Sequence, residues 1–148
     1  MNAPPLPRNR SVPAATVIPV LRYRDVRAAV AWLCDAFGFR ERLQIAEHRA
    51  QLTFGDGALV VADGGEAPAT GAKRDSVMIR VQDLDAHCER ARRHGAEIVN
   101  PPTDYPFGER QYSAVDPYGH HWTFTQTTAD SNPSSWGGIL KMGDAAGS

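Results

Sequence analysis

Two histidines and one arginine in the second half of the chain are the side chains best suited to chemistry. His120 and His121 are adjacent, and Arg110 precedes them. An imidazole titrates near neutral pH, so it can act as a general base or hydrogen-bond a ligand. A guanidinium can clamp a carboxylate or phosphate with two parallel hydrogen bonds. These residue types predict a site for a small polar molecule.

The two histidines are expected to point to opposite faces of one strand. They follow the turn residues Asp116-Pro117-Tyr118-Gly119 and open an apolar, β-branched stretch. Because successive side chains of a strand alternate, the pair cannot chelate one metal ion. We expect His121 to share a face with Thr123, as a general base or a hydrogen-bond partner of a ligand. The alternative is a histidine at a solvent-exposed rim or in ordinary packing.

The neighbours of Arg110 are aromatic. They are Tyr105, Phe107 and Tyr112. Such rings would suit stacking on a planar ligand, although at least one of them is expected in the core. Arg110 itself could face a ligand, or it could pair with Asp116 or Glu109 to hold a turn. The sequence does not decide between these two roles.

An internal repeat indicates which elements position these residues. Leu21-Arg22-Tyr23-Arg24-Asp25 resembles Ile79-Arg80-Val81-Gln82-Asp83, with the same offset of 58 positions from 21 to 79 and from 25 to 83. A second echo joins Asp56-Gly57 to Asp116-Pro117-Tyr118-Gly119, each followed by an apolar stretch. A repeat of this length predicts one supersecondary unit used twice.

Each copy reads as a strand, a helix and three further strands, which is an α+β fold of two βαβββ modules. The predicted strands are 17–23, 39–46, 49–54, 58–62, 76–81, 96–100, 109–115 and 121–126, and the predicted helices are 26–37 and 84–94. A four-stranded sheet with a helix on one face leaves its other face open. We therefore expect an eight-stranded, cup-like incomplete barrel with the helices outside and a ligand in the cup.

The organisation along the chain is a single domain over residues 16–130, made of modules 16–63 and 76–127. Residues 1–15, rich in proline, predict a flexible arm, and a polar, glycine-rich link joins the modules. Residues 131–148 form a tail that contains Trp136. A tryptophan in such a tail needs an apolar surface, so we expect it to cover the cup or contact a partner subunit.

The composition excludes several classes of function. Of 148 residues, 42% are hydrophobic and 22% charged, and the net charge of -1 argues against binding to nucleic acid or an anionic membrane. No apolar run reaches the roughly 20 residues of a spanning helix, and no leader is visible, so a cytoplasmic location is expected. Cys34 and Cys88 are not equivalent in the repeat. We expect buried free thiols there and no disulfide.

Several of these segments resemble the vicinal oxygen chelate superfamily. They are Arg-x-x-Asp at Arg22 and Arg80, Ala-Phe-Gly-Phe at 36–39, Phe-Gly-Glu-Arg-Gln-Tyr at 107–112 and Asp-Pro-Tyr-Gly-His at 116–120. The superfamily includes glyoxalase I, extradiol dioxygenases, fosfomycin-resistance thiol transferases and bleomycin-binding proteins. The resemblance covers approximately Thr16 to Gln126. It implies the cup-shaped fold and a structural role for His120.

In the metal-dependent members, the resemblance implies one metal ligand on the first and one on the last strand of each module. The first-strand position, seven residues before the motif aspartate, is Ile18 in the first module and Ser76 in the second. The last-strand position, four residues after the turn glycine, is Val61 in the first module and Thr123 in the second. Aliphatic and hydroxyl groups do not replace imidazole, carboxylate or thiolate ligands. We therefore predict no metal and no cofactor.

The sequence thus predicts metal-independent binding or sequestration of an unknown small molecule, with a homodimer as the expected assembly. The residues expected to line the cup are Ile18, Val61, Ser76, Arg110, Tyr112, His121 and Thr123. The alternative is a lyase, isomerase or dioxygenase-type enzyme with a non-standard site, in which His121 is the candidate catalytic residue and acts with Arg110. A third interpretation is an interaction module whose cup is filled by its own side chains or by Trp136.

Overall fold

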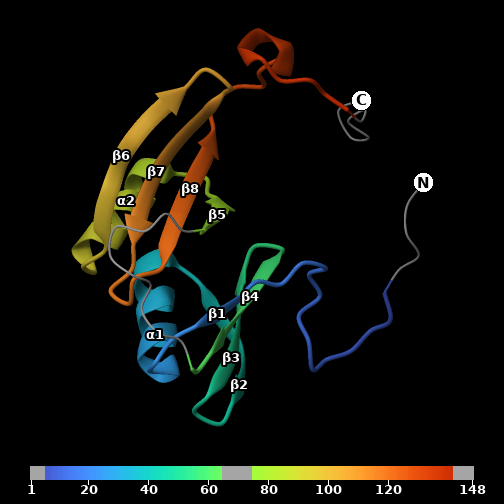
Figure 1. Cartoon of the computed structure of the whole chain (residues 1–148), viewed down its shortest axis with the longest axis vertical. Helices are drawn as coiled ribbons and strands as arrows, with labels where there is room; N and C mark the ends of the chain where they lie inside the picture. Colours follow the sequence, from blue (N-terminus) through green and yellow to red (C-terminus); the bar gives the residue numbers. More distant parts are fainter. Residues whose placement is uncertain (1–5, 65–74, 142–148) are drawn as a thin grey trace. The chain divides into compact units, whose positions relative to one another are not determined.

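The computed structural model describes residues 6–64 and 75–141. The chain divides into two compact units, Met1–Ala72 with Arg93–Gly95, and Lys73–Arg92 with Ala96–Ser148. Each unit holds one four-stranded sheet and one α-helix (Figure 1). Most of the predicted link between the modules, residues 65–74, lies outside the described residues, as do 1–5 of the predicted arm and 142–148 of the tail.

The first unit has the predicted βαβββ order. Its sheet runs β1-β4-β3-β2, with β1 parallel to β4 and the other pairs antiparallel. The strands are β1 (Val20–Arg22), β2 (Arg40–Ile45), β3 (Arg49–Phe54) and β4 (Gly57–Ala62). Helix α1 (Val26–Trp32) continues as a π-helical turn over Leu33–Phe37 and stops at Gly38, whose φ is +88°.

The second unit repeats this topology. Its sheet runs β5-β8-β7-β6, again with the first and last strands of the module parallel. The elements are β5 (Ser76–Arg80), α2 (Leu84–Arg93), β6 (Glu97–Tyr105), β7 (Glu109–Val115) and β8 (His121–Thr127). The repeated motif aspartates have the same role, because Asp25 accepts from the amide of Ala28 and Asp83 from that of Ala86. The two-module prediction is confirmed.

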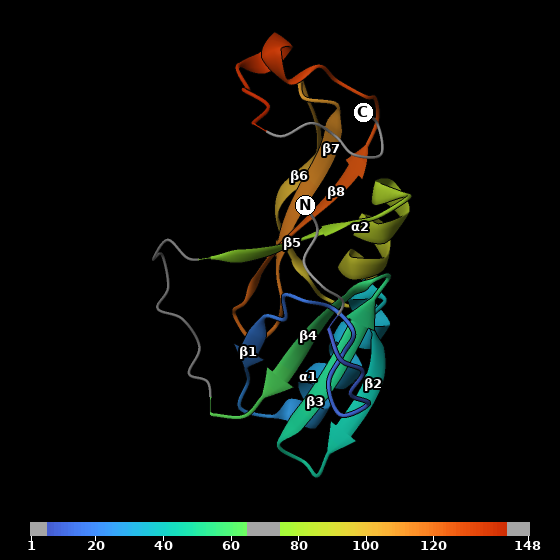
Figure 2. The ribbon, with the colours of Figure 1, turned by 90° about the vertical axis from the view of Figure 1, so that its right-hand side faces the viewer.

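Each sheet has one face packed against its helix (Figures 1 and 2). In the first unit the pair Leu52 and Leu59 is on the helix side, and Glu41, which is opposite Leu52, forms an ion pair with Arg27 of α1. In the second unit the completely buried side chains of Tyr112 and Phe124 contact His87 of α2. The helix sides therefore hold the two apolar cores.

Strand β6 is longer than predicted. The sequence suggested an end near Asn100, but the strand continues through Pro101 and Pro102 to Tyr105. Its pairing with β7 shifts register between Ile98 and Asn100 and again between Asn100 and Thr103. These irregularities accommodate the two prolines, because a proline has no backbone N–H to donate to a regular ladder.

Asp116 fixes the turn that leads into β8. Its side chain is buried, and Oδ1 accepts hydrogen bonds from the amides of Tyr118 and His120. Oδ2 accepts from Nε1 of Trp122 at 3.1 Å. The carboxylate therefore ties the turn to the core, and the strand that carries His121 starts from a fixed point.

The chain after β8 turns back over Gly108. The carbonyl of Gly108 accepts a hydrogen bond from the amide of Thr128 at 2.8 Å. A 3₁₀ turn follows over Pro133–Trp136, and the centroid of the Trp136 ring lies 5.4 Å from that of the Phe107 ring. Within the described part of the chain, no helix is long and apolar enough to cross a membrane.

We predict that Gly108→Ala is much more destabilising than Gly95→Ala. Both glycines have a positive φ, so an alanine at either position costs about 1 kcal/mol. A Cβ at position 108 would collide with the carbonyl oxygen of Ala129, whereas at position 95 nothing lies within 4 Å. Urea unfolding should show a further loss of roughly 1–3 kcal/mol for Gly108→Ala. Equal losses for the two variants would contradict the packed return of the tail.

Candidate functional site

The candidate site is the face of the second sheet that points away from α2, which we call the polar face. Side chains paired across a sheet share a face, so the register defines its members. They are Ser76, Met78 and Arg80 on β5, His121, Thr123, Thr125 and Thr127 on β8, Glu109, Gln111, Ser113 and Val115 on β7, and Glu97, Asn100, Thr103 and Tyr105 on β6. Most of these side chains carry a hydrogen-bonding group, in contrast to the helix side of the same sheet.

A hydrogen-bonded row crosses the polar face. Its centre is the Glu109 carboxylate, which accepts from Oγ1 of Thr125 at 2.6 Å and from Oγ1 of Thr127 at 2.7 Å. Nη2 of Arg80 donates to Oγ1 of Thr127 at 3.1 Å. These contacts fix the rotamers of the row before any ligand arrives, and a carboxylate has further acceptor positions for a ligand.

A second hydroxyl pair lies beside this row. The Oγ of Ser113 and Oγ1 of Thr123 are 3.2 Å apart. His121 is on the same strand as Thr123, opposite Ser76, and its ring is partly exposed. The register thus brings Ser76, His121 and Thr123 together on one face. None of the described residues hydrogen-bonds the His121 ring, so the imidazole can meet an incoming polar group.

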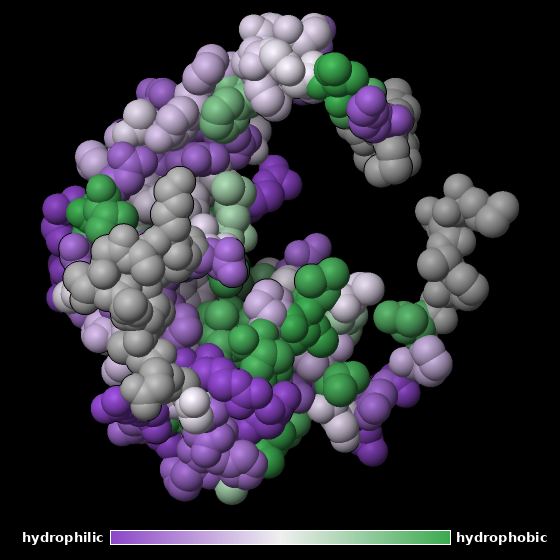
Figure 3. Space-filling model, viewed as in Figure 1, coloured by the Kyte–Doolittle hydropathy of each residue, from purple (hydrophilic) through white to green (hydrophobic). Residues whose placement is uncertain are grey.

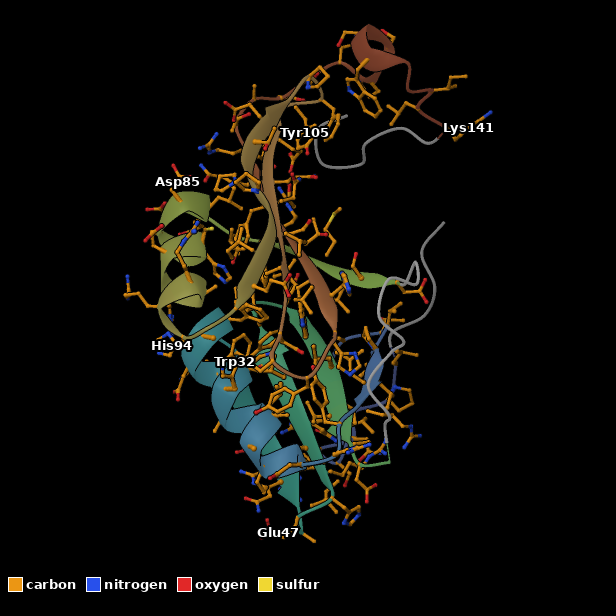
Figure 4. All side chains as sticks on the ribbon, turned by 60° about the vertical axis from the view of Figure 1, so that its left-hand side comes forward. Trp32, Glu47, Asp85, His94, Tyr105 and Lys141 are labelled. Atoms are coloured by element: carbon orange, nitrogen blue, oxygen red, sulfur yellow. The ribbon has the colours of Figure 1, made fainter. Side chains whose placement is uncertain are left out.

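Aromatic rings gather at the end of β6. The rings of Tyr105 and Phe107 stack with their centroids 5.3 Å apart, and the Trp136 ring lies against the ring of Phe107. Nδ2 of Asn100 donates to the Tyr105 hydroxyl at 3.2 Å. Figure 4 shows Tyr105 at this end of the strand. Trp136 remains 44% exposed, so the cluster presents aromatic surface to solvent.

Arg110 lies on the helix side of the sheet and not on the polar face. Its Nε donates to Asp85 of α2 at 3.1 Å and its Nη1 to Asp104 of β6 at 3.2 Å (Asp85 is labelled in Figure 4). The hydrogen bond that Arg110 donates to Asp85, followed by the one that it donates to Asp104, raises the pKa of Arg110. Neither Asp116 nor Glu109 is its partner. Arg110 is therefore removed from the cup-lining set, and it cannot act together with His121.

Tyr112 must also be removed from that set. Its side chain is completely buried, its hydroxyl is 2.6 Å from Nδ1 of His87, and its ring stacks on Phe124. Burial raises the pKa of the Tyr112 phenol well above its usual range. The next residue, Ser113, occupies the polar face instead.

Val61 is likewise on the helix side of its sheet. It pairs with Leu21 and is completely buried, whereas Val60 pairs with Val20 on the open face. The equivalent of Val60 is Thr123, which pairs with Met78. The count of four residues from the turn glycine therefore selects the wrong residue of β4, one position too far along. The reason is that Gly57 already belongs to β4, whereas β8 begins two residues after Gly119. Ile18 lies two residues before Val20 and outside β1.

The donor set does not fit a divalent metal. With the corrected register, the four implied positions hold Ile18, Val60, Ser76 and Thr123. A divalent ion needs imidazole, carboxylate or thiolate ligands. Across residues 6–64 and 75–141, no three His, Cys, Asp or Glu side chains converge as they would around a metal ion. No reaction step through a metal can be derived from these residues.

The two cysteines add no reactive group to this face. Neither forms a disulfide bond, and burial raises the pKa of Cys34 and of Cys88. A raised pKa lowers the fraction of nucleophilic thiolate at neutral pH.

Sequence reasoning missed Arg80, Glu109 and Thr125. The alternation that selects His121 and Thr123 also selects Thr125. Glu109 and Arg80 could not be found this way, because their place depends on which residues of β7 and β5 pair with β8.

Comparison with known proteins decides the family. The model of the Glyoxalase/Bleomycin resistance protein/Dioxygenase superfamily matches residues 15–124, most of the chain and nearly all of both modules. The chain belongs to this superfamily. The resemblance seen in its sequence motifs is therefore confirmed.

Several solved structures are similar to this chain. TioX from Micromonospora sp. ML1 is 38% identical, with coverage of 75% of this chain and 98% of TioX and a TM-score of 0.63. The fosfomycin resistance protein FosX from Listeria monocytogenes, crystallised as the E126Q mutant with Mn(II) and 1S,2S-dihydroxypropylphosphonic acid, is 14% identical, with coverage of 78% and 88% and a TM-score of 0.61. At this identity FosX shows only a shared fold.

A curated relative matches a shorter region. The protein Mb0911c of Mycobacterium bovis is 35% identical over 57 residues, which is 38% of this chain and 38% of Mb0911c. The match therefore spans well under half of the length of Mb0911c.

The buried Tyr112 predicts a loss of stability at high pH. An exposed tyrosine has a pKa of about 10, so the unfolded chain releases this proton first as the pH rises. The folded chain keeps it, and the unfolding free energy must fall as the pH rises above about 10. Urea titrations at several pH values should show a shallower fall for Tyr112→Phe than for the parent. The same fall of the unfolding free energy with pH in both chains would contradict a buried, protonated phenol.

Proposed function

We propose that this member of the superfamily binds and sequesters a small polar organic molecule on the polar face, without a metal ion. The observation that carries the proposal is the preformed row of Arg80, Thr127, Glu109 and Thr125. A row whose groups are already oriented loses little entropy when a ligand binds, and it selects ligands with several donors and acceptors.

The two ends of the polar face favour different parts of such a ligand. Ser76, His121 and Thr123 offer hydroxyl and imidazole groups for a polar portion. Tyr105, Phe107 and Trp136 offer rings for a planar portion. A ligand with a hydrogen-bonding part and an aromatic part therefore matches this face better than an aliphatic one.

The residues around His121 favour a binding role over catalysis. In the enzyme alternative His121 acts with Arg110, but that guanidinium is engaged by Asp85 and Asp104 on the other side of the sheet. His121 lies between Ser76 and Val115, with Thr123 on the same face, and these neighbours support hydrogen bonding to a ligand. The unknown small molecule and a homodimer remain proposals, and sedimentation of the full chain would test the second.

We expect the full chain to bind bleomycin, used as a probe with both polar and planar parts, equally well with and without EDTA. Quenching of tryptophan fluorescence would measure the affinity. Thr123→Val removes one hydroxyl from the polar face and should weaken binding about threefold to tenfold. Thr128→Val changes an exposed residue beyond β8 and should have no effect.

Two results would contradict this function. One is saturable binding that appears only after Mn(II) or another divalent metal is added. The other is turnover of a methylglyoxal–thiol adduct that His121→Ala abolishes, which would make the face an active site.

A further inference from the structure

Two side chains of the polar face carry opposite charges and are joined only through a hydroxyl group. The hydroxyl of Thr127 accepts from Nη2 of Arg80 at 3.1 Å and donates to Oε2 of Glu109 at 2.7 Å. Across residues 6–64 and 75–141, neither Arg80 nor Glu109 belongs to an ion pair. Figure 3 shows mainly hydrophilic residues over this sheet, whereas apolar residues gather over β1 and β4 of the first unit. The second sheet therefore holds a cation and an anion on either side of one hydroxyl.

The carboxylate of Glu109 is oriented to receive a cation. The hydroxyl of Thr125, a residue only 3% exposed, donates to Oε1 at 2.6 Å, and the hydroxyl of Thr127 donates to Oε2. Both donors are neutral, so they fix the carboxylate without neutralising its charge. Each oxygen keeps a further lone pair, and the Glu109 side chain is partly exposed. An ammonium group of a ligand would supply the opposite charge.

The guanidinium of Arg80 offers the complementary group. Arg80 ends β5, an edge strand of the sheet, and is exposed. In the described part of the chain its side chain donates one hydrogen bond, to Thr127. Most of its N–H donors are therefore left to bind a carboxylate, which a guanidinium holds with two parallel hydrogen bonds.

Aromatic surface adjoins the Glu109 end of this arrangement. Glu109 pairs with Tyr105 across the sheet, and such paired residues have Cβ atoms about 5 Å apart. The Tyr105 ring stacks on that of Phe107, which in turn contacts the ring of Trp136. Ring faces attract an ammonium group and also stack on a planar side chain. A ligand that carries its charges close to an aromatic group therefore matches both features.

We propose that the ligand of the polar face has a zwitterionic head group of the amino-acid type, with its ammonium on Glu109, its carboxylate on Arg80 and an aromatic side chain near Tyr105. The inference rests on the proposed function and names the class of ligand for the same face. In an α-amino acid both charged groups are attached to one carbon atom, which suits two complementary charges separated by a single hydroxyl. A ligand with one charge satisfies one side chain and meets the like charge of the other, so it binds more weakly.

The test compares three ligands that share the same phenyl ring and linker, by isothermal titration calorimetry of the full chain at neutral pH. L-Phenylalanine carries both charges, phenethylamine carries only the ammonium, and 3-phenylpropanoate carries only the carboxylate. Phenylalanine should bind at least about tenfold more tightly than either of the others, because each charge-assisted hydrogen bond contributes about that factor. Equal affinities for the three ligands would overturn the proposal.

Two variants that remove one charge each assign the charges of the ligand to their side chains. Glu109→Gln should weaken phenylalanine and phenethylamine at least about tenfold, and should not weaken 3-phenylpropanoate. Arg80→Gln should weaken phenylalanine and 3-phenylpropanoate, and should not weaken phenethylamine. Glu97→Gln, the matched control at an exposed position of the same face, should leave all three affinities unchanged.

The proposal is also overturned if a folded Glu109→Gln chain loses affinity equally for the three ligands, or if Glu97→Gln weakens phenylalanine as much as Glu109→Gln does. If the Glu109→Gln chain does not fold, Arg80→Gln at its exposed position gives the decision by the same comparison. Bleomycin quenching separates this inference from the proposed function. Bleomycin binding that Thr123→Val weakens, with no preference for phenylalanine, would overturn the zwitterion and leave the polar face as a binding site.

Discussion

The pairing of the first strand of each module with the last one determines the chemistry of both sheets. β1 runs parallel to β4 and β5 runs parallel to β8, each in one fixed register. Since side chains alternate along a strand, a shift of one residue would move every core residue to the open face. The core residues Val61 and Phe124 and the open-face residues Val60 and Thr123 follow from this one constraint.

The same pairing of first and last strands gives the two sheets different open faces. On the helix sides of the described strands, the charged residues are paired, as in Glu41 with Arg27 and Arg110 with Asp85. On the open sides the sheets differ, because the first carries Val60 and Ala62 and the second carries threonines around Glu109. The same scaffold therefore presents open faces of different polarity in the two units.

Much of the fold was predictable because it depends on local signals. Asp25 and Asp83 mark the helix starts, Gly38 marks a helix end, and apolar alternation marks the strands, with β3 and β7 at the predicted bounds. The continuation of β6 through Pro101 and Pro102 was not predictable, because bulges made in pairing with β7 allow it. Prolines alone argue against a strand.

The site was less predictable because side-chain partners are distant in sequence. The face of Arg110 is set by Asp85, 25 residues away, and the side chain of Gln51 donates to the carbonyl of Ser11, 40 residues away. Val61 was misplaced because the turns of the two modules differ in length, which repeat counting does not reveal. His121 and Thr123 were predictable because they lie on one strand and need only alternation.

The most direct test of the central claim, that this superfamily member keeps the scaffold without a metal-binding donor set, is the metal content of the full chain. The chain would be dialysed to equilibrium against Zn(II), Ni(II), Mn(II) or Fe(II) in turn, and the bound metal counted by inductively coupled plasma mass spectrometry. The account predicts far less than one metal ion per chain, unchanged by Ser76→Ala or Thr123→Val. One tightly bound ion per chain that either substitution removes would contradict it.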